Sequence, residues 1–195
     1  MDTPYAIEML NITKRFPGII ANGNITLQLK RGEILGFSGL YAYDAEGQLV
    51  PELAEKEPEV SEDGLTYTFK IRQGINWVDN QNRVVAPVKA DDFVAGMQHM
   101  MDAMGGLEYL VCSGCANIVG ADEYVAGTLT DFNQVGVEAI DDYTLQYTLT
   151  TPTSYFMTML GYGVFAPMSR SYYESMGGKF GADFDNTAAD YTYGK

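Results

Sequence analysis

The sequence predicts an α+β fold, in which antiparallel strand pairs combine with two or three helices. Alternating apolar and polar residues, the pattern of half-buried strands, occur at 5–35, 65–72 and 136–149. Apolar residues at helical spacing form one long amphipathic pattern at 90–104. Because short runs of turn residues separate the strands of a pair, the pairs are expected to be hairpins.

The first predicted element is an N-terminal β-hairpin within residues 5–35. Apolar residues alternate with polar neighbours in both halves of this segment: Ile7, Met9 and Ile12, then Ile25, Leu27 and Leu29. Turns are predicted at Pro17-Gly18 and at Asn22-Gly23-Asn24.

Two later segments predict the central strands. In LTYTFKIR, residues 65–72, apolar and polar side chains alternate after the turn residues Ser61 to Gly64. A second hairpin is expected from strands at 136–140 and 143–149, with a turn at Asp141-Asp142.

The clearest predicted helix covers 90–104. Asp91 and Asp92 fall in its first turn, where negative charge suits the helix dipole, and Gly105-Gly106 is expected to end it. One stripe contains its large apolar residues: Phe93, Met97, Met100, Met101 and Met104. We interpret the stripe as core-facing; the alternative is an adaptable methionine-rich binding surface.

Two shorter helices are predicted towards the C-terminus, at 153–160 and 171–176. Ser171 and Glu174 have the spacing of a capping box, and Gly177-Gly178 provides a stop signal. Residues 182–195 lack periodicity and are expected to form a loop.

Charge excludes one class of function. The chain has a net charge of −14, with twelve basic and 26 acidic residues, and residues 1–40 hold four of the basic and three of the acidic ones. The acidity therefore lies in residues 41–195, which argues against nucleic-acid binding. No apolar run is long enough to span a bilayer. The N-terminus does not resemble a signal peptide, so the chain as written is expected to stay in the cytoplasm.

No catalytic or metal-binding constellation is recognisable. His99 is the one histidine and is expected to be a partly exposed residue on the helix. Cys112 and Cys115 form a C-x-x-C pair that could be a redox pair or half of a zinc site. We interpret them as two small half-buried residues, and the sequence leaves their redox state open. We therefore expect no enzymatic activity, no cofactor and no metal.

The N-terminal run resembles a known ATPase family. It reads YAIEMLNITKRFPGIIANGNITLQLKRGEI and is similar to the opening of sugar-type ABC transporter ATPases. By resemblance, Phe16 matches an aromatic residue that stacks on adenine in that family. The glycine-rich phosphate loop, the signature motif and the magnesium carboxylate have no counterpart here, so nucleotide binding is not expected to function.

Residues 41–195 resemble family 5 solute-binding proteins, the oligopeptide- and dipeptide-binding receptors of ABC importers. The resemblance rests on three runs in the same order: LYAYDAEGQLVPELAEKEPEVSEDGLTYTFKIRQGINW, KADDFVAGMQHMMD and VEAIDDYTLQYTLTTPTSYFMTMLGYGVFAPMSRSYYESMGGKFG. It implies the extra small domain of a receptor of the periplasmic-binding-protein type II superfamily, which is extracytoplasmic. It also implies a peptide ligand and permease subunits as partners.

These resemblances divide the chain into three parts. Residues 1–40 are an incomplete ATPase-like hairpin, 41–175 a small receptor domain, and 176–195 a truncated connection toward the large lobe. The predicted function is a fragment of a peptide receptor without tight binding of its own. The alternatives are a nucleotide-binding ATPase fragment and a non-functional hybrid of two transporter genes, joined at Phe37 to Tyr41.

One ligand-binding residue is carried over from the receptor family. Tyr109 matches a position at which a tyrosine of the small domain faces the bound peptide. The alternative is a tyrosine that packs at the end of the helix.

Overall fold

In the computed structural model, the chain forms two compact units, residues 1–37 and residues 38–195. The structure describes residues 5–16, 19–30, 38–78 and 83–184. For 5–16 and 19–30, the description covers the backbone. The predicted turn at Pro17-Gly18, residues 31–37 and most of the C-terminal loop at 182–195 lie outside the described residues.

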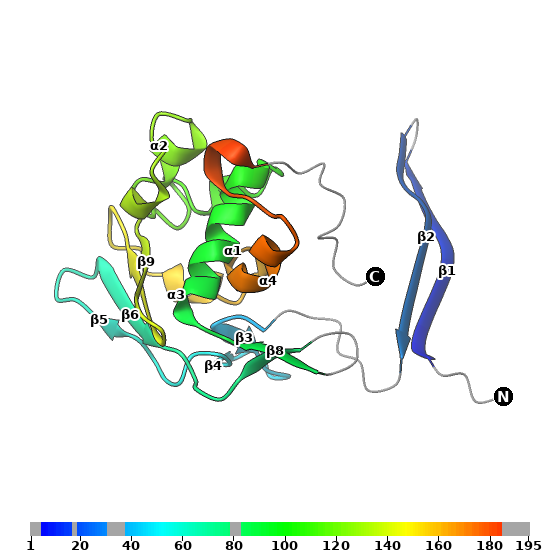
Figure 1. The fold of residues 1–195 in the computed structure, drawn as a ribbon, viewed down its shortest axis with the longest axis horizontal. Coiled ribbons are helices and arrows are strands. Elements are labelled where there is room, and N and C mark those ends of the chain that lie inside the picture. Colours follow the sequence, from blue (N-terminus) through cyan, green and yellow to red (C-terminus); the bar gives the residue numbers. More distant parts are fainter. Residues whose placement is uncertain (1–4, 17–18, 31–37, 79–82, 185–195) are drawn as a thin grey trace. The chain divides into compact units, whose positions relative to one another are not determined.

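The first unit contains an antiparallel hairpin, β1 (Tyr5–Phe16) and β2 (Ile19–Lys30), which confirms the predicted strands (Figure 1). The predicted turn at Asn22–Asn24 is wrong, because these residues lie within β2. The register of the pair shifts on both sides of Lys14, which pairs with Asn22. Such irregularities let a strand continue through residues that favour turns.

The second unit is built on a four-stranded antiparallel sheet in the order β5-β6-β10-β9. The bounds of its strands are Glu59–Val60 for β5, Thr66–Lys70 for β6, Val137–Asp141 for β9 and Thr144–Thr148 for β10. The central pair, β6 and β10, joins the two strand segments that the sequence predicts most clearly. Tyr67, Phe69, Leu145 and Tyr147 are buried on one face of this pair, as their alternation requires.

The turn between β9 and β10 falls one residue later than predicted, at Asp142-Tyr143. Asp141 is still part of β9. Its carboxylate accepts hydrogen bonds from the backbone N–H of Tyr143 (2.8 Å) and the hydroxyl of Thr144 (2.7 Å). An aspartate that bonds the backbone two residues on closes the turn after itself.

Two small hairpins were not predicted. One pairs β3 (Tyr41–Tyr43) with β4 (Leu49–Pro51), and the other pairs β7 (Asn76–Val78) with β8 (Val84–Pro87). Their strands contain three or four residues, too few for a period of two to be recognised.

The long helix α1 (Ala90–Ala103) confirms the prediction at 90–104. Phe93, Met97 and Met101 are buried, which supports the core-facing interpretation of the stripe, but Met104 is exposed. The helix ends at Met104, which adopts the left-handed conformation with a φ of 47°. The predicted stop at Gly105-Gly106 is therefore one residue late.

Three shorter helices complete the described part of this unit: α2 (Ala121–Val125), α3 (Phe156–Met159) and α4 (Arg170–Ser175). The predictions at 153–160 and 171–176 correspond to α3 and α4, whereas α2 was not predicted. The capping box assigned to Ser171 is wrong, because Ser169 is the N-cap and its hydroxyl accepts from the N–H of Tyr172 (3.4 Å). Four 3₁₀ turns connect these elements: η1 (Glu108–Leu110), η2 (Phe132–Gln134), η3 (Gly163–Phe165) and η4 (Gly181–Asp183).

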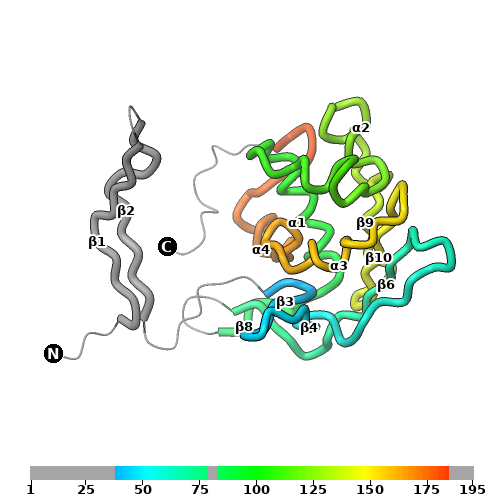
Figure 2. The backbone as a smooth tube through the Cα atoms, turned by 180° about the vertical axis from the view of Figure 1, so that it is seen from behind, coloured from blue at the N-terminus to red at the C-terminus, as the bar shows by residue number. Residues whose placement is uncertain are grey.

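Helix α1 lies between the sheet and the C-terminal helix α4 (Figures 1 and 2). On the sheet side, Tyr147 contacts the rings of Phe69, Phe156 and Phe165 within one hydrophobic core. On the other side, a smaller cluster contains Ala95, Met168 and Tyr173. The helix therefore joins the two cores of the second unit.

Candidate functional site

Three large apolar side chains are exposed in the short segment that follows α1. They are Met104, Leu107 and Tyr109, with exposed fractions of 55%, 52% and 57%. Tyr109 lies in η1, so the alternative of a tyrosine packed at the helix end is not what the structure has. Exposed apolar side chains gathered in one short segment make this segment a candidate contact surface.

The backbone beneath these side chains is held by hydrogen bonds. A carboxylate oxygen of Glu108 accepts from the N–H of Gly106 (2.8 Å), and the N–H of Leu110 donates to the carbonyl of Leu107 (3.0 Å). Val111 and Ile118 are buried and anchor the end of the segment in the main core. The segment therefore presents Leu107 and Tyr109 from a fixed backbone.

The C-x-x-C pair lies directly beyond this segment. Cys112 and Cys115 are free thiols, and both are half-buried, as predicted. Burial, reinforced by the nearby carboxylates of Asp122 and Glu108, raises the pKa of Cys112 to about 11. Among the residues that the structure describes, no group of three or more His, Cys, Asp or Glu side chains could hold a metal ion.

His99 is partly exposed, as expected from the sequence. Its ring makes edge contacts with Tyr173 (5.0 Å between centroids) and Phe184 (5.3 Å). Burial lowers the pKa of His99, and the negative charge of Asp102 opposes this shift. The environment favours the neutral imidazole.

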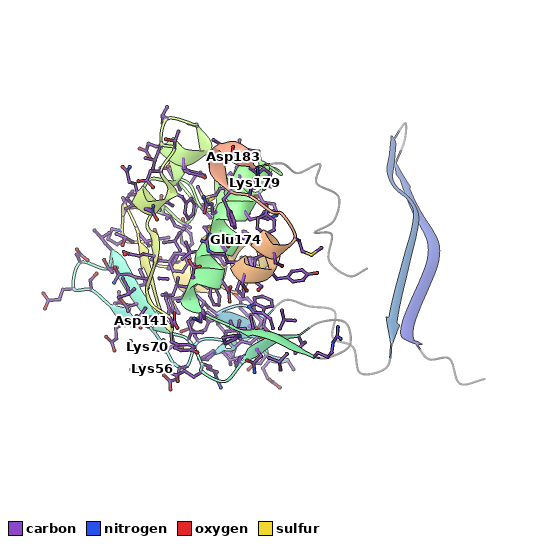
Figure 3. The ribbon with its side chains drawn as sticks, viewed as in Figure 1. Lys56, Lys70, Asp141, Glu174, Lys179 and Asp183 are labelled. Atoms are coloured by element: carbon purple, nitrogen blue, oxygen red, sulfur yellow. The ribbon has the colours of Figure 1, made fainter. Side chains whose placement is uncertain are left out.

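A second surface feature, at one end of the sheet, was missed by the sequence analysis. It is an open depression of about 710 Å³, lined by Glu55, Lys70, Ile71, Arg72, Gln73, Asp141, Tyr143 and Thr144. The ammonium of Lys70 donates to Thr144 Oγ1 (2.6 Å), which donates to Asp141 (2.7 Å), and Figure 3 shows Lys70 and Asp141 close together. The bond from Thr144 contributes most to lowering the pKa of Asp141. Lys70 and Asp141 are therefore linked through Thr144 at the edge of the depression.

Phe16, the residue matched to adenine stacking, is the last residue of β1. The structure does not describe its side chain. The prediction for Phe16 therefore stays a prediction.

The fold of the second unit is shared with known peptide receptors. One solved structure, Listeria monocytogenes OppA bound to peptide, matches with a TM-score of 0.61 and 30% identity, over 71% of this chain and 26% of that one. The murein tripeptide binding protein MppA of Escherichia coli matches with a TM-score of 0.62 and 28% identity, again over 71% and 26%. The second unit therefore has the fold of a segment of bacterial peptide-binding receptors.

The sequence relatives define the family. The oligopeptide-binding protein AmiA of Streptococcus pneumoniae is 42% identical over 156 residues, which cover 80% of this chain and 23% of AmiA. The oligopeptide-binding protein SarA of Streptococcus gordonii is 41% identical over 78% of this chain and 22% of SarA. The family model for bacterial extracellular solute-binding proteins, family 5 Middle, matches residues 48–192. The chain belongs to family 5 of the bacterial extracellular solute-binding proteins.

The chain spans about a quarter of the length of the curated relatives that it matches. No helix within the described residues is both long enough and apolar enough to cross a membrane.

Proposed function

We propose that this chain is a segment of an extracytoplasmic oligopeptide receptor that delivers peptides to the permease subunits of an ABC importer. The main support for this proposal is the family 5 match over residues 48–192. Relatives named as oligopeptide-binding proteins add to it. The role is binding rather than catalysis, because the relatives are binding proteins.

Within this receptor segment, Tyr109 contacts the peptide. Its exposed ring on the hydrogen-bonded 3₁₀ turn η1 offers a flat apolar surface at low entropic cost. Leu107 and the flexible Met104 extend this surface and adapt to different peptide side chains. Such a contact tolerates many sequences, as an oligopeptide receptor requires.

The chain alone binds peptides weakly. It contributes about a quarter of the length of its relatives, so most of the surface that encloses a peptide in a whole receptor belongs to other parts. Contacts from one side leave most of the ligand in water.

A titration followed by ¹H–¹⁵N NMR tests this function. Mixed tri- to pentapeptides added to millimolar concentration are expected to shift the amide signals of 104–110 without saturation in the micromolar range. Tyr109→Ala should reduce these shifts severalfold, whereas Tyr43→Ala, another exposed tyrosine, should not. Micromolar binding would contradict the weak affinity, and shifts confined to other segments would contradict the assignment of Tyr109.

For residues 1–40, we propose an origin in the ATPase of a sugar-type ABC transporter, joined to the receptor segment near Phe37 to Tyr41. A boundary between compact units at Phe37 and Ser38 supports this, as does a family match that begins at residue 48. The join leaves Phe16 without phosphate contacts, so a fluorescent ATP analogue is expected not to bind. Saturable binding that Phe16→Ala abolishes would favour a nucleotide site instead. A genomic DNA read that runs unbroken across codons 30–50 would establish a real fusion. If no such read exists, the fusion is artificial.

A further inference from the structure

Cys112 and Cys115 are brought together by a β-turn. The N–H of Cys115 donates to the carbonyl of Cys112 (3.2 Å), which is the bond that closes a turn over Ser113 and Gly114. Gly114 has a φ of +86°, as the third residue of a type II turn requires. In such a turn the outer Cα atoms lie within about 7 Å of each other. Disulfides need Cα atoms roughly 4.4–6.8 Å apart, so the backbone distance is suitable.

The turn is held in place from several sides. The side chain of Asn117 accepts from the N–H of Gly114 (2.8 Å), and the N–H of Asn117 donates to the carbonyl of Cys112 (3.1 Å). The hydroxyl of Tyr155 donates to the carbonyl of Cys115 (3.0 Å). Both cysteine side chains are half-buried and pack against the main hydrophobic core.

We infer that Cys112 and Cys115 are a site of oxidative modification, at which an intramolecular disulfide closes across the turn in an oxidising environment. The oxidant is a small-molecule or protein disulfide. One cysteine thiolate attacks a sulfur of the oxidant and releases one thiol. The second cysteine then attacks the mixed disulfide and releases the other thiol. The two cysteines lose two electrons and two protons, and the oxidant is reduced to two thiols.

The surroundings suit a structural disulfide rather than a redox catalyst. The raised pKa of Cys112 makes its thiolate scarce at neutral pH, so closure is slow and accelerates as pH rises. A thiol that ionises with difficulty is also a poor leaving group, which slows reduction of the closed form. Disulfides of this kind persist in extracytoplasmic compartments.

Closure would act on the adjacent exposed segment. The Cys112 thiol donates weakly to the carbonyl of Glu108 (3.4 Å), and the N–H of Cys112 donates to the carbonyl of Tyr109 (3.2 Å). Oxidation removes the thiol donor and fixes Cys112 to Cys115. We expect slower amide hydrogen exchange in 108–118 of the oxidised chain.

The test is a redox titration of the whole chain in mixtures of reduced and oxidised glutathione at about pH 8. After acid quenching and alkylation with N-ethylmaleimide, intact mass is expected to show a monomer lacking two hydrogen atoms and carrying no maleimide. Cys112→Ser and Cys115→Ser should lose this species. Stable glutathione adducts, disulfide-linked dimers or a chain that stays reduced in oxidised glutathione would each overturn the inference.

Two glycine variants test whether closure of the disulfide depends on the geometry of the turn. An alanine at Gly114 meets no atom within 4 Å but is strained at the positive φ. The reduced turn can relax away from this strain, whereas the disulfide requires the turn. Gly114→Ala should therefore lower the closure equilibrium constant by about fivefold or more. Gly105→Ala, also without close neighbours and without a positive φ, should leave it unchanged. Equal effects of the two substitutions would contradict the role of the turn.

Discussion

The buried carboxylate of Asp92 joins three segments of the second unit. It accepts hydrogen bonds from the indole N–H of Trp77 (2.8 Å) and the backbone N–H groups of Lys89 (2.9 Å) and Arg170 (3.1 Å). These donors belong to β7, the start of α1 and the start of α4. Hydrogen bonds to a charged acceptor are stronger than those to a neutral one, so Asp92 does more than the helix-dipole role assigned from the sequence.

Asp92→Ala should therefore strongly destabilise the protein. The substitution leaves three donors without their acceptor, and we expect a loss of about 3 kcal/mol in the free energy of unfolding. Urea denaturation followed by circular dichroism measures this loss. Asp91→Ala is the matched control, because its half-exposed carboxylate pairs with Arg170 and its loss should cost below about 1 kcal/mol. Similar costs for both variants would contradict the role of Asp92.

His99 should make stability depend on pH in the mildly acidic range. Burial lowers its pKa in the folded protein, so the unfolded chain, with a histidine pKa of about 6.5, binds the proton more readily. Stability should be full above about pH 6.5, fall as the pH decreases toward the folded pKa, and level off below that pKa. Urea midpoints between about pH 7.5 and 5.5 measure the fall. His99→Gln removes the one histidine, and an equal fall in this variant would exclude His99 as its source.

At the scale of elements, Gly96 allows α1 to approach the chain that leads into α4. A Cβ at this position would lie 2.4 Å from the carbonyl oxygen of Ala166 and 3.2 Å from the N–H nitrogen of Met168. The same N–H donates to the carbonyl of Asp92 (2.9 Å). The contact is therefore between backbones, which cannot easily move apart.

Gly96→Ala should destabilise the fold although alanine favours helices. The gain in helix propensity is about 1 kcal/mol, whereas the clash with fixed backbone costs roughly 1–3 kcal/mol or more. We expect a net loss of about 1–2 kcal/mol in urea denaturation. Gly105→Ala, with nothing within 4 Å, should change stability by less than about 0.5 kcal/mol. A stabilised Gly96→Ala variant would show that the segment at 166–168 can retreat.

The elements that were predicted correctly have enough residues to show a period. Helix α1 and the strands β6, β9 and β10 repeat apolar residues over several positions and bury them. The strands β3, β4, β7 and β8 are too short to show a period, and tertiary contacts decide their conformation. The end of α1 was misplaced by one residue, because tertiary contacts and not the residue pattern decide that it ends at Met104.

The candidate site was only partly predictable. Tyr109 was predicted from the family resemblance. The exposure of Met104 and Leu107 was not predicted, because it depends on where α1 ends. The turn at Cys112 could be inferred from Ser113-Gly114, but the packing of both cysteines against the core could not, because it depends on residues far along the chain. The depression near Lys70 joins residues far apart in sequence and left no local signal.

At the scale of the whole molecule, the two compact units should differ in their independence. Among the side chains that the structure describes, which all belong to the second unit, the main buried core runs from Leu40 to Phe165. Removal of residues 1–37 should therefore shift the thermal midpoint of the second unit by at most a few degrees. Circular dichroism of residues 38–195 beside the full chain measures this. Loss of the cooperative transition would show that the first unit supports the second.

The pairing of β6 with β10 also constrains how the protein is made. Lys70 meets Thr144 across 74 positions and Thr68 meets Gln146 across 78, so the centre of the sheet joins distant parts of the chain. Closing so long a loop is slow compared with forming local helices. During synthesis, Tyr67 and Phe69 have no partner strand on this side until Thr144–Thr148 has been made. We therefore expect the nascent chain to bind chaperones that recognise exposed apolar strands.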